Sequence, residues 1–238
     1  MAVVVTSADR SGVAATVAMQ LRQAISRLQE NPDRIVQVCL TGGRIANEVY
    51  RQLADASDLQ VVDWGRVEFW WGDERFVAVE SPDRNAGQSL ALLAATIPFD
   101  PARVHPMPAR GSAEADLRQA ALHYASELGA TIFDICLLGV GEDGHIASLF
   151  PEHPSFEKDT SSNVVGVTNS PKPPSERLSL TLPVLNRSAE VWLIVAGAEK
   201  AAPVARAIAG DDRLPAGSVQ GTERTVWFLD EEAAPSVG

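Results

Sequence analysis

The chain has 238 residues, of which 20 are Lys or Arg and 31 are Asp or Glu, giving a formal net charge of −11. This balance excludes the broad basic surface that a sequence-independent nucleic-acid binder needs, and it does not suit a protein drawn to anionic membranes. Hydrophobic residues make up 45% of the chain and charged residues 21%, as in an ordinary globular protein, so disorder is excluded for most of it.

The apolar runs of the sequence bear on the cellular location of the protein and on the state of its two cysteines. No stretch of the sequence approaches the roughly 18 consecutive apolar residues of a membrane span. The N-terminus lacks the basic segment and the longer apolar run of a secretory signal, so we expect a cytoplasmic protein. Cys39 and Cys136 each lie inside an apolar run and are predicted to be buried thiols rather than a disulfide or a metal pair.

Short apolar runs alternate with helical periods along the chain. In chain order the predicted elements are a strand at 3–5, a helix over 13–28, a strand at 35–40, a helix over 45–53, a strand at 67–71, a helix over 85–93, a helix ending near 128, a strand at 133–138, short strands at 163–167 and 179–181, a strand at 191–196, a helix through 204–208 and a strand at 225–229. Ser112 is predicted to cap the fourth helix, and Pro203 must lie among the first residues of the last one.

Strands that alternate with helices favour a mostly parallel sheet with helices on both faces. The chain has no internal repeat and no long linker, so we expect one domain over residues 1–238. Ligands of such sheets bind beyond the carboxyl ends of the strands. We therefore expect the loops that follow Leu40, Trp71, Leu138 and Ala196 to form one site.

The first two of these loops carry groups suited to an anion. Thr41-Gly42-Gly43-Arg44 precedes a helix, and paired glycines let backbone amides fold around a phosphate; the alternative is a plain tight turn. In the second loop, Asp73 and Glu74 adjoin Arg75. Carboxylates that hold an Arg orient its guanidinium for bidentate anion binding, and the alternative is a solvated ion-pair cluster.

The third loop, residues 139–151, formally contains G-x-G-x-x-G after a strand. We reject a dinucleotide site because Pro151 and Pro154 would stop the following helix after about two turns. We interpret the glycines as flexible backbone that presents Asp143 and His145 at the sheet edge, where an imidazole can take a proton from water. The alternative is that Asp143 caps a short helix and His145 packs. No His, Cys or Asp pair has metal-ligand spacing, so no metal site is expected.

Two of the three lysines of the chain lie in loops between predicted elements, as the candidate residues above do. Lys172 and Arg177 bracket a proline-rich stretch, and Lys200 begins a helix after Gly197-Ala198-Glu199. Lys158 shows that a solvated lysine also occurs, so scatter is the alternative. A cation at a helix N-terminus opposes the helix dipole, so Glu199 or an anionic ligand should compensate Lys200.

Taken together, five segments of the chain resemble the motif series of 6-phosphogluconolactonases, which share a superfamily with glucosamine-6-phosphate deaminases. These segments are Thr41-Gly42-Gly43, residues 72–77, residues 139–151, residues 172–177 and residues 197–200. The resemblance implies a three-layer αβα fold with a mostly parallel sheet and a modified Rossmann-like core. It also implies hydrolysis of 6-phosphogluconolactone to 6-phosphogluconate without a metal or organic cofactor.

Carried over by motif, His145 is the general base and Asp143 orients it. The resemblance and the loop chemistry place ten further residues at the substrate or its phosphate: Thr41, Gly42, Gly43, Arg44, Asp73, Arg75, Gly141, Lys172, Arg177 and Lys200. Arg75, Arg177 and Lys200 are predicted to form a small basic pocket in an acidic surface. The sequence leaves open whether Arg44, Arg177 or Lys200 touches the phosphate, and it leaves the oligomeric state open.

Two other functions are weighed against this one. A deaminase or aldose–ketose isomerase of the same superfamily carries Asn-Glu-Pro after the Asp-Gly-His segment, whereas this chain has Ser148-Leu149-Phe150-Pro151. A sugar-phosphate-binding regulator without catalysis is expected to have a degraded base position, whereas both Asp143 and His145 are present.

Overall fold

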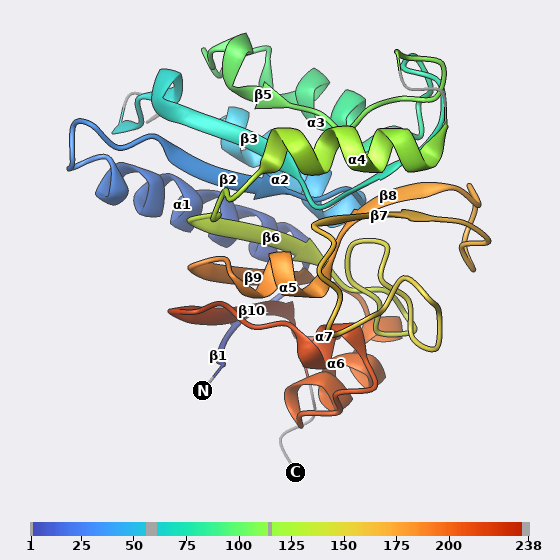
Figure 1. The fold of residues 1–238 in the computed structure, drawn as a ribbon. Helices are drawn as coiled ribbons and strands as arrows, with labels where there is room; N and C mark the ends of the chain where they lie inside the picture. Colours follow the sequence, from blue (N-terminus) through green and yellow to red (C-terminus); the bar gives the residue numbers. More distant parts are fainter. Residues whose placement is uncertain (1, 56–60, 114–115, 235–238) are drawn as a thin grey trace.

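The computed structural model describes residues 2–55, 61–113 and 116–234. A seven-stranded sheet with the order β1-β10-β9-β6-β2-β3-β5 runs through the molecule, and every pairing in it is parallel (Figure 1). Its strands are β1 (Val3–Ser7), β2 (Val36–Leu40), β3 (Val67–Trp71), β5 (Val104–His105), β6 (Ile135–Gly139), β9 (Glu190–Val195) and β10 (Arg224–Asp230). The predicted three-layer α/β fold is confirmed.

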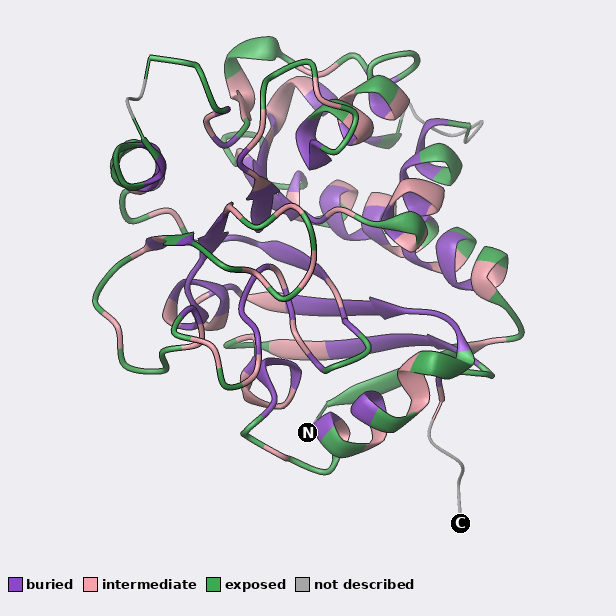
Figure 2. Cartoon of the chain, turned by 90° about the vertical axis from the view of Figure 1, so that its right-hand side faces the viewer, coloured by how far each residue is buried: buried purple, intermediate pink, exposed green. Residues whose placement is uncertain are grey.

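Two apolar cores lie on opposite faces of this sheet. One face is covered by α1 (Arg10–Leu28), α2 (Arg44–Ala54) and α3 (Asn85–Leu93). The other face is covered by α4 (Leu117–Leu128), α5 (Leu182–Asn186), α6 (Ala201–Ile208) and α7 (Pro215–Ser218), together with a smaller sheet. Because both faces are buried, the central strands are apolar at nearly every position rather than at alternate ones, as the purple strands in Figure 2 show.

The smaller sheet is antiparallel and was not predicted. Its order is β4 (Asp73–Arg75), β8 (Arg177–Leu180) and β7 (Val164–Val167). Gly72 joins the two sheets, since its N–H donates to the Leu40 carbonyl at 2.9 Å and its carbonyl accepts from the Leu180 N–H at 2.8 Å. The segment after β3 that looked like a loop is therefore a short strand, and its pairing sets Asp73 and Arg75 beside β8.

Most predicted elements are found within one to three residues of their expected ends. The cap of α4 was wrong: Asp116 caps the helix by accepting the Gln119 N–H at 2.9 Å, and residues 114–115 lie outside the described part of the chain. Ser112 instead donates to the Ala109 carbonyl. Pro203 is the third residue of α6, as its missing N–H requires.

The short helix expected after Gly144 was also wrong. The backbone turns there, with a bridge between Ile146 and Leu149, and Ala147 has a φ of 47°, which no right-handed helix contains. Elements that the sequence did not suggest are β5, α5, α7 and the 3₁₀ turns at Trp64–Arg66, Pro101–Arg103 and Ala198–Lys200. All of these are only two to five residues long, too short to show a period.

Cys39 and Cys136 are register neighbours on β2 and β6, and both are buried free thiols, as predicted. Among the described residues, no helix is long and apolar enough to cross a membrane.

The buried carboxylate of Glu74 fixes α3 to the small sheet. It accepts the N–H groups of Arg75, Asn85 and Ala86 at 2.7 to 2.9 Å, and it lies 3.6 Å from the buried guanidinium of Arg84. Burial raises the pKa of Glu74 above its usual range, while the charge of Arg84 and the three amides oppose that rise. The predicted cluster of acids around Arg75 thus holds a different arginine.

We expect Glu74→Ala to lower the free energy of unfolding by about 3–5 kcal/mol, because it leaves the buried guanidinium of Arg84 without its counter-charge and three amides without their acceptor. Asp212→Ala is the matched control, since Asp212 pairs with Lys158 on the surface, and its loss should leave the free energy of unfolding nearly unchanged. Urea unfolding of both variants measures the difference. Equal stabilities would show that Glu74 does not hold α3.

Candidate active site

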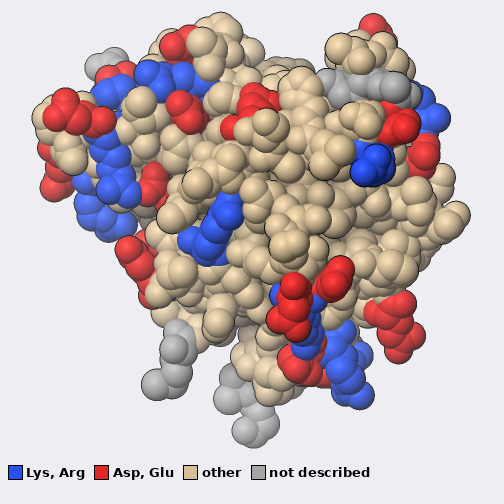
Figure 3. Space-filling model, viewed as in Figure 1, with Lys and Arg blue, Asp and Glu red and all other residues tan. Residues whose placement is uncertain are grey.

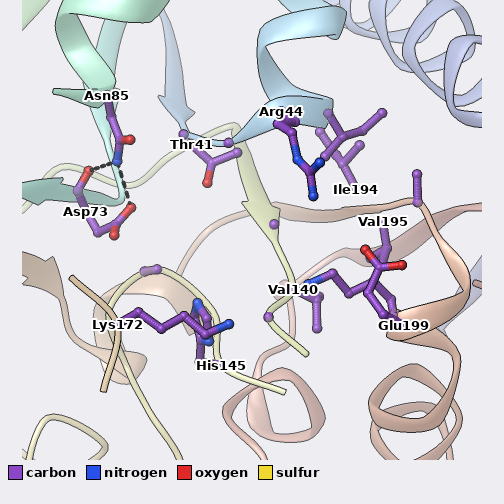
Figure 4. Close-up of a pocket in the computed structure, with 18 of the residues that line it drawn as sticks. Thr41, Arg44, Asp73, Asn85, Val140, His145, Lys172, Ile194, Val195 and Glu199 are labelled. Atoms are coloured by element: carbon purple, nitrogen blue, oxygen red, sulfur yellow. Dashed lines mark hydrogen bonds between the residues drawn. The ribbon is translucent and has the colours of Figure 1, made fainter. Parts of the chain in front are cut away.

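A cavity of about 300 Å³ opens beyond the carboxyl ends of the central strands (Figure 4). The loops after β2, β3, β6 and β9 all reach it, as the parallel sheet predicts. Its walls include eleven of the twelve residues expected at the site, namely Thr41, Gly42, Gly43, Arg44, Asp73, Arg75, Gly141, His145, Lys172, Arg177 and Lys200. The twelfth, Asp143, touches the cavity through His145.

His145 and Asp143 form a hydrogen-bonded pair at the cavity. Nδ1 of His145 lies 2.5 Å from Oδ1 of Asp143, and the imidazole packs against the Phe150 ring with 4.6 Å between centroids. Burial alone would raise the pKa of Asp143, but the hydrogen bond and charge of His145 bring it well below its usual range. An ionised carboxylate only accepts hydrogen bonds, so Nδ1 of His145 donates in this pair, and Nε2 is the ring nitrogen left to exchange a proton with a ligand or water.

Gly141 makes room for this pair. A Cβ atom at Gly141 would overlap Nδ1 of His145 and lie 2.5 Å from Oδ1 of Asp143. The Gly141 N–H also donates to the His145 carbonyl at 2.8 Å, which closes the turn between the two residues. The glycines of the third loop therefore give the pair its space, in agreement with their interpretation as backbone that presents Asp143 and His145.

The loop Thr41-Gly42-Gly43-Arg44 after β2, called the glycine loop below, is held in place by two buried side chains. Buried Tyr50 accepts the Thr41 N–H at 3.0 Å and donates to the Thr41 carbonyl at 2.7 Å. A Cβ at Gly42 would overlap the Asn85 side chain, which donates to the Asp73 carbonyl at 3.0 Å. Gly43 has a φ of 110° and precedes α2, so the first amides of an eleven-residue helix begin at the cavity.

The carboxylates of the second loop do not hold Arg75 as expected. Its Nη1 instead donates to the Asp83 backbone carbonyl at 2.6 Å. Asp73 accepts the Ser148 hydroxyl at 2.7 Å and lies 3.9 Å from the Arg177 guanidinium. Arg75 lines the cavity, and the hydrogen bond to the Asp83 carbonyl is the one found for its guanidinium among the described residues, so the other Nη group is left for an anion.

Arg177 and Lys172 belong to one loop and the strand that follows it. Arg177 is buried and donates to the backbone carbonyls of Lys172, Pro173 and Pro174 at 3.0 to 3.2 Å. Burial lowers the pKa of Arg177, and the nearby Asp73 charge opposes that change. The side chain of Lys172 extends toward His145 (Figure 4).

Lys200 enters the cavity from the loop after β9, and its Nζ lies 3.8 Å from the carboxylate of Glu142. Partial burial lowers the pKa of Lys200, while Glu142 raises it more than Glu199 does. The compensating acid thus comes mainly from the third loop, and Glu199 adds to it. On the face drawn in Figure 3, Lys and Arg lie in small groups among Asp and Glu, in keeping with the net charge.

Three polar residues that line the cavity were not among the predicted site residues: Arg10, Asn85 and Glu199. Arg10 is the first residue of α1 and follows β1. Its position just beyond a predicted parallel strand was the feature of the sequence that could have placed it at the site. Among the described residues, no group of three or more His, Cys, Asp or Glu is arranged to hold a metal ion. The donors in the cavity are cations and amides, which suit an anionic ligand.

Comparisons with known proteins agree with the geometry. A family model described as glucosamine-6-phosphate isomerases/6-phosphogluconolactonase matches residues 8–227. A 6-phosphogluconolactonase of Streptomyces coelicolor is 45% identical over 210 residues, which cover 83% of this chain and 80% of that one. One of Mycobacterium leprae is 44% identical over 211 residues, which cover 84% of each.

Solved structures show the same fold. A 6-phosphogluconolactonase of Thermotoga maritima has a TM-score of 0.84 and 30% identity, and the match covers 97% of this chain and all of that one. A monomeric glucosamine-6-phosphate deaminase has a TM-score of 0.81 at 21% identity over 97% of this chain and 98% of that one, which shows a common fold alone. On its sequence and its fold, the chain belongs to the family of glucosamine-6-phosphate isomerases and 6-phosphogluconolactonases.

Proposed function

We propose that this protein hydrolyses 6-phospho-D-glucono-1,5-lactone to 6-phosphogluconate in the oxidative pentose phosphate pathway. The observation that carries the proposal is the Asp143–His145 pair in a cavity that six Lys and Arg residues line. The named relatives at 44% and 45% identity support the lactone as substrate. No comparable observation favours a deaminase or a non-catalytic regulator.

In the proposed mechanism, Nε2 of His145 takes a proton from a water molecule as the water oxygen attacks the lactone carbonyl carbon. The carbonyl oxygen becomes an oxyanion, and Asp143 stabilises the imidazolium that forms. When the tetrahedral intermediate collapses, the bond from this carbon to the ring oxygen breaks. His145 returns its proton to the ring oxygen, which becomes a hydroxyl group, and the new carboxylic acid releases the second proton of the water.

The proposed phosphate site lies at the other end of the cavity. The amides of Gly42 and Gly43 and the start of α2 supply backbone donors, and Arg44 and Lys200 supply charge. Figure 4 shows Arg44 pointing into the cavity on the side away from His145. Binding energy at the phosphate then orients the distant carbonyl for attack. The cytoplasmic location and the absence of a nucleic-acid partner stay predictions from the sequence.

The test is a coupled assay with freshly generated lactone, corrected for spontaneous hydrolysis. We expect His145→Ala to lower kcat by about 10²–10⁴-fold, because a positioned base contributes that factor. The affinity for 6-phosphogluconate should change little. His123→Ala, on the exposed side of α4, is the control and should match the unaltered protein.

Two results would count against this function. Release of ammonia from glucosamine 6-phosphate with no lactonase activity would identify a deaminase. Equal losses of kcat and of product affinity in His145→Ala would remove His145 from the role of base.

Gly141→Ala should act on chemistry without touching the substrate. Its methyl group pushes Nδ1 of His145 away from Asp143, so kcat should fall by at least about tenfold while the affinity for 6-phosphogluconate stays close to normal. Gly111→Ala is the control for a glycine with open space around it, although its φ of 83° makes a modest loss of stability expected. Unchanged kcat in Gly141→Ala would show that the pair does not need this geometry.

Phosphate affinity should also depend on pH through Lys200. Since burial lowers the pKa of Lys200 below 10.5, its charge is lost at lower pH than that of a free lysine. We expect the Kd for 6-phosphogluconate, measured by calorimetry, to rise as the pH is raised from about 8 toward 10.5, because a phosphate monoester is already almost fully ionised throughout this range. Lys200→Arg keeps the charge throughout and should remove most of this rise. The same pH dependence in both proteins would exclude Lys200 from the phosphate site.

A further inference from the structure

The cations of the cavity enter it from different walls. Arg44 enters from the start of α2, and Lys200 enters from the loop after β9, where its Nζ lies 3.8 Å from the carboxylate of Glu142. Lys172 enters from the opposite wall, beside His145 (Figure 4). Its charge also acts on Asp143, lowering the pKa of that carboxyl group. Lys172 therefore lies at the end of the cavity that holds the base, and the charge of Asp143 acts on Lys200 as well, raising its pKa against the effect of burial.

The backbone that carries Lys172 has no regular secondary structure of its own. The loop turns between β7 and β8 and contains a cis bond between Pro173 and Pro174. Arg177 ties it to the fold by donating from Nε to the Pro174 carbonyl at 3.2 Å and from Nη2 to the Lys172 and Pro173 carbonyls, both at 3.0 Å. Within the loop, the Ser170 hydroxyl donates to the Lys172 carbonyl at 2.9 Å and accepts the Lys172 N–H at 3.3 Å. Three of the five N–H groups of Arg177 are thus used inside the protein.

Arg177 is itself held in place by buried neighbours. Its side chain is 6% exposed, and Nη1 lies 3.9 Å from Oδ2 of Asp73, which also accepts the Ser148 hydroxyl at 2.7 Å. Its guanidinium lies over the Phe150 ring at 5.8 Å, and the same ring packs against His145. A buried arginine with these contacts is built as part of the wall, and it links the Lys172 loop to the surroundings of His145.

We propose that Lys172 stabilises the oxyanion that forms on the lactone carbonyl, and that Arg177 is a positioning residue that holds Lys172 beside His145. The proposal rests on the lactonase function proposed above, and it gives Arg177 a role other than the phosphate contact that the sequence left open. The ammonium group forms its strongest contact only when the carbonyl oxygen becomes negative, so it lowers the barrier more than it strengthens ground-state binding. No proton moves to or from Lys172 in this step.

The first arm of the test locates Lys172. Lys172→Ala should lower kcat by about 10²–10³-fold, the usual cost of removing one oxyanion donor. Glucitol 6-phosphate carries the phosphate but no carbonyl, and its Kd should be the same for Lys172→Ala as for the unaltered protein. Lys200→Ala is the comparison, with an expected rise in that Kd. A similar rise in Lys172→Ala with kcat retained would place Lys172 at the phosphate and overturn the proposal.

The second arm tests the positioning role of Arg177. Arg177→Lys keeps the charge but has a single nitrogen, which cannot reach three carbonyl groups. Its kcat should fall about as far as in Lys172→Ala, with the Kd for glucitol 6-phosphate unchanged. The double variant should lose no more than Lys172→Ala alone, because both changes remove the same interaction. If the fall in kcat of the double variant equals the product of the two single falls, the positioning role of Arg177 is contradicted. A raised Kd for glucitol 6-phosphate in Arg177→Lys would contradict it as well. If Arg177→Lys does not fold, Arg177→Gln takes its place with the same measurements.

Lys158→Ala, whose lysine pairs with Asp212 on the surface, controls for the loss of a positive charge. If neither it nor the unaltered protein hydrolyses the lactone, the proposed function fails. The glucitol 6-phosphate arm still reports where Lys172 lies: an unchanged Kd in Lys172→Ala then supports its place away from the phosphate, and a raised Kd contradicts it.

Discussion

The common direction of the seven central strands is the constraint on which the site depends. Because every pairing is parallel, the carboxyl ends of β2, β6 and β9 lie at one edge, and loops that are far apart in the sequence meet there. The helices on both faces bury the sheet and leave this edge as the place where polar groups collect. Gly72 then lets the chain pass from β3 into the small sheet, which adds Asp73, Arg75 and Arg177 as a further wall.

In the proposed mechanism, one part of the cavity carries out the chemistry and another binds the phosphate. The turn from Gly141 to His145 presents the proposed base, whose Nδ1 is hydrogen-bonded to Asp143. The glycine loop, α2 and Lys200 provide the donors proposed for the phosphate. The net charge of −11 is compatible with such a ligand, because the Lys and Arg residues that line the cavity form a small group on an otherwise acidic protein. Overall acidity thus limits the size of the anion and does not forbid one.

Much of this could be predicted from the sequence, since apolar runs mark the buried strands and the polar loops that follow them mark the site. The partners of the charged residues could not be predicted. Asp73 and Glu74 adjoin Arg75 in the chain, yet they lie against Arg177 and Arg84, because the pairing of β4 with β8 and the start of α3 decide what each carboxylate meets. Arg10 was missed for a similar reason, as its approach to the cavity depends on where the edge strand β1 lies.

The central claim is that one end of the cavity holds the phosphate and the other end, at His145, holds the reacting carbonyl. A crystal structure with bound 6-phosphogluconate tests it most directly, since this product carries both a phosphate and the newly formed carboxylate. We expect the phosphate on the amides of Gly42 and Gly43 with Lys200, and the carboxylate within hydrogen-bond distance of Nε2 of His145. A phosphate bound beside His145, or a carboxylate on the glycine loop, would contradict it.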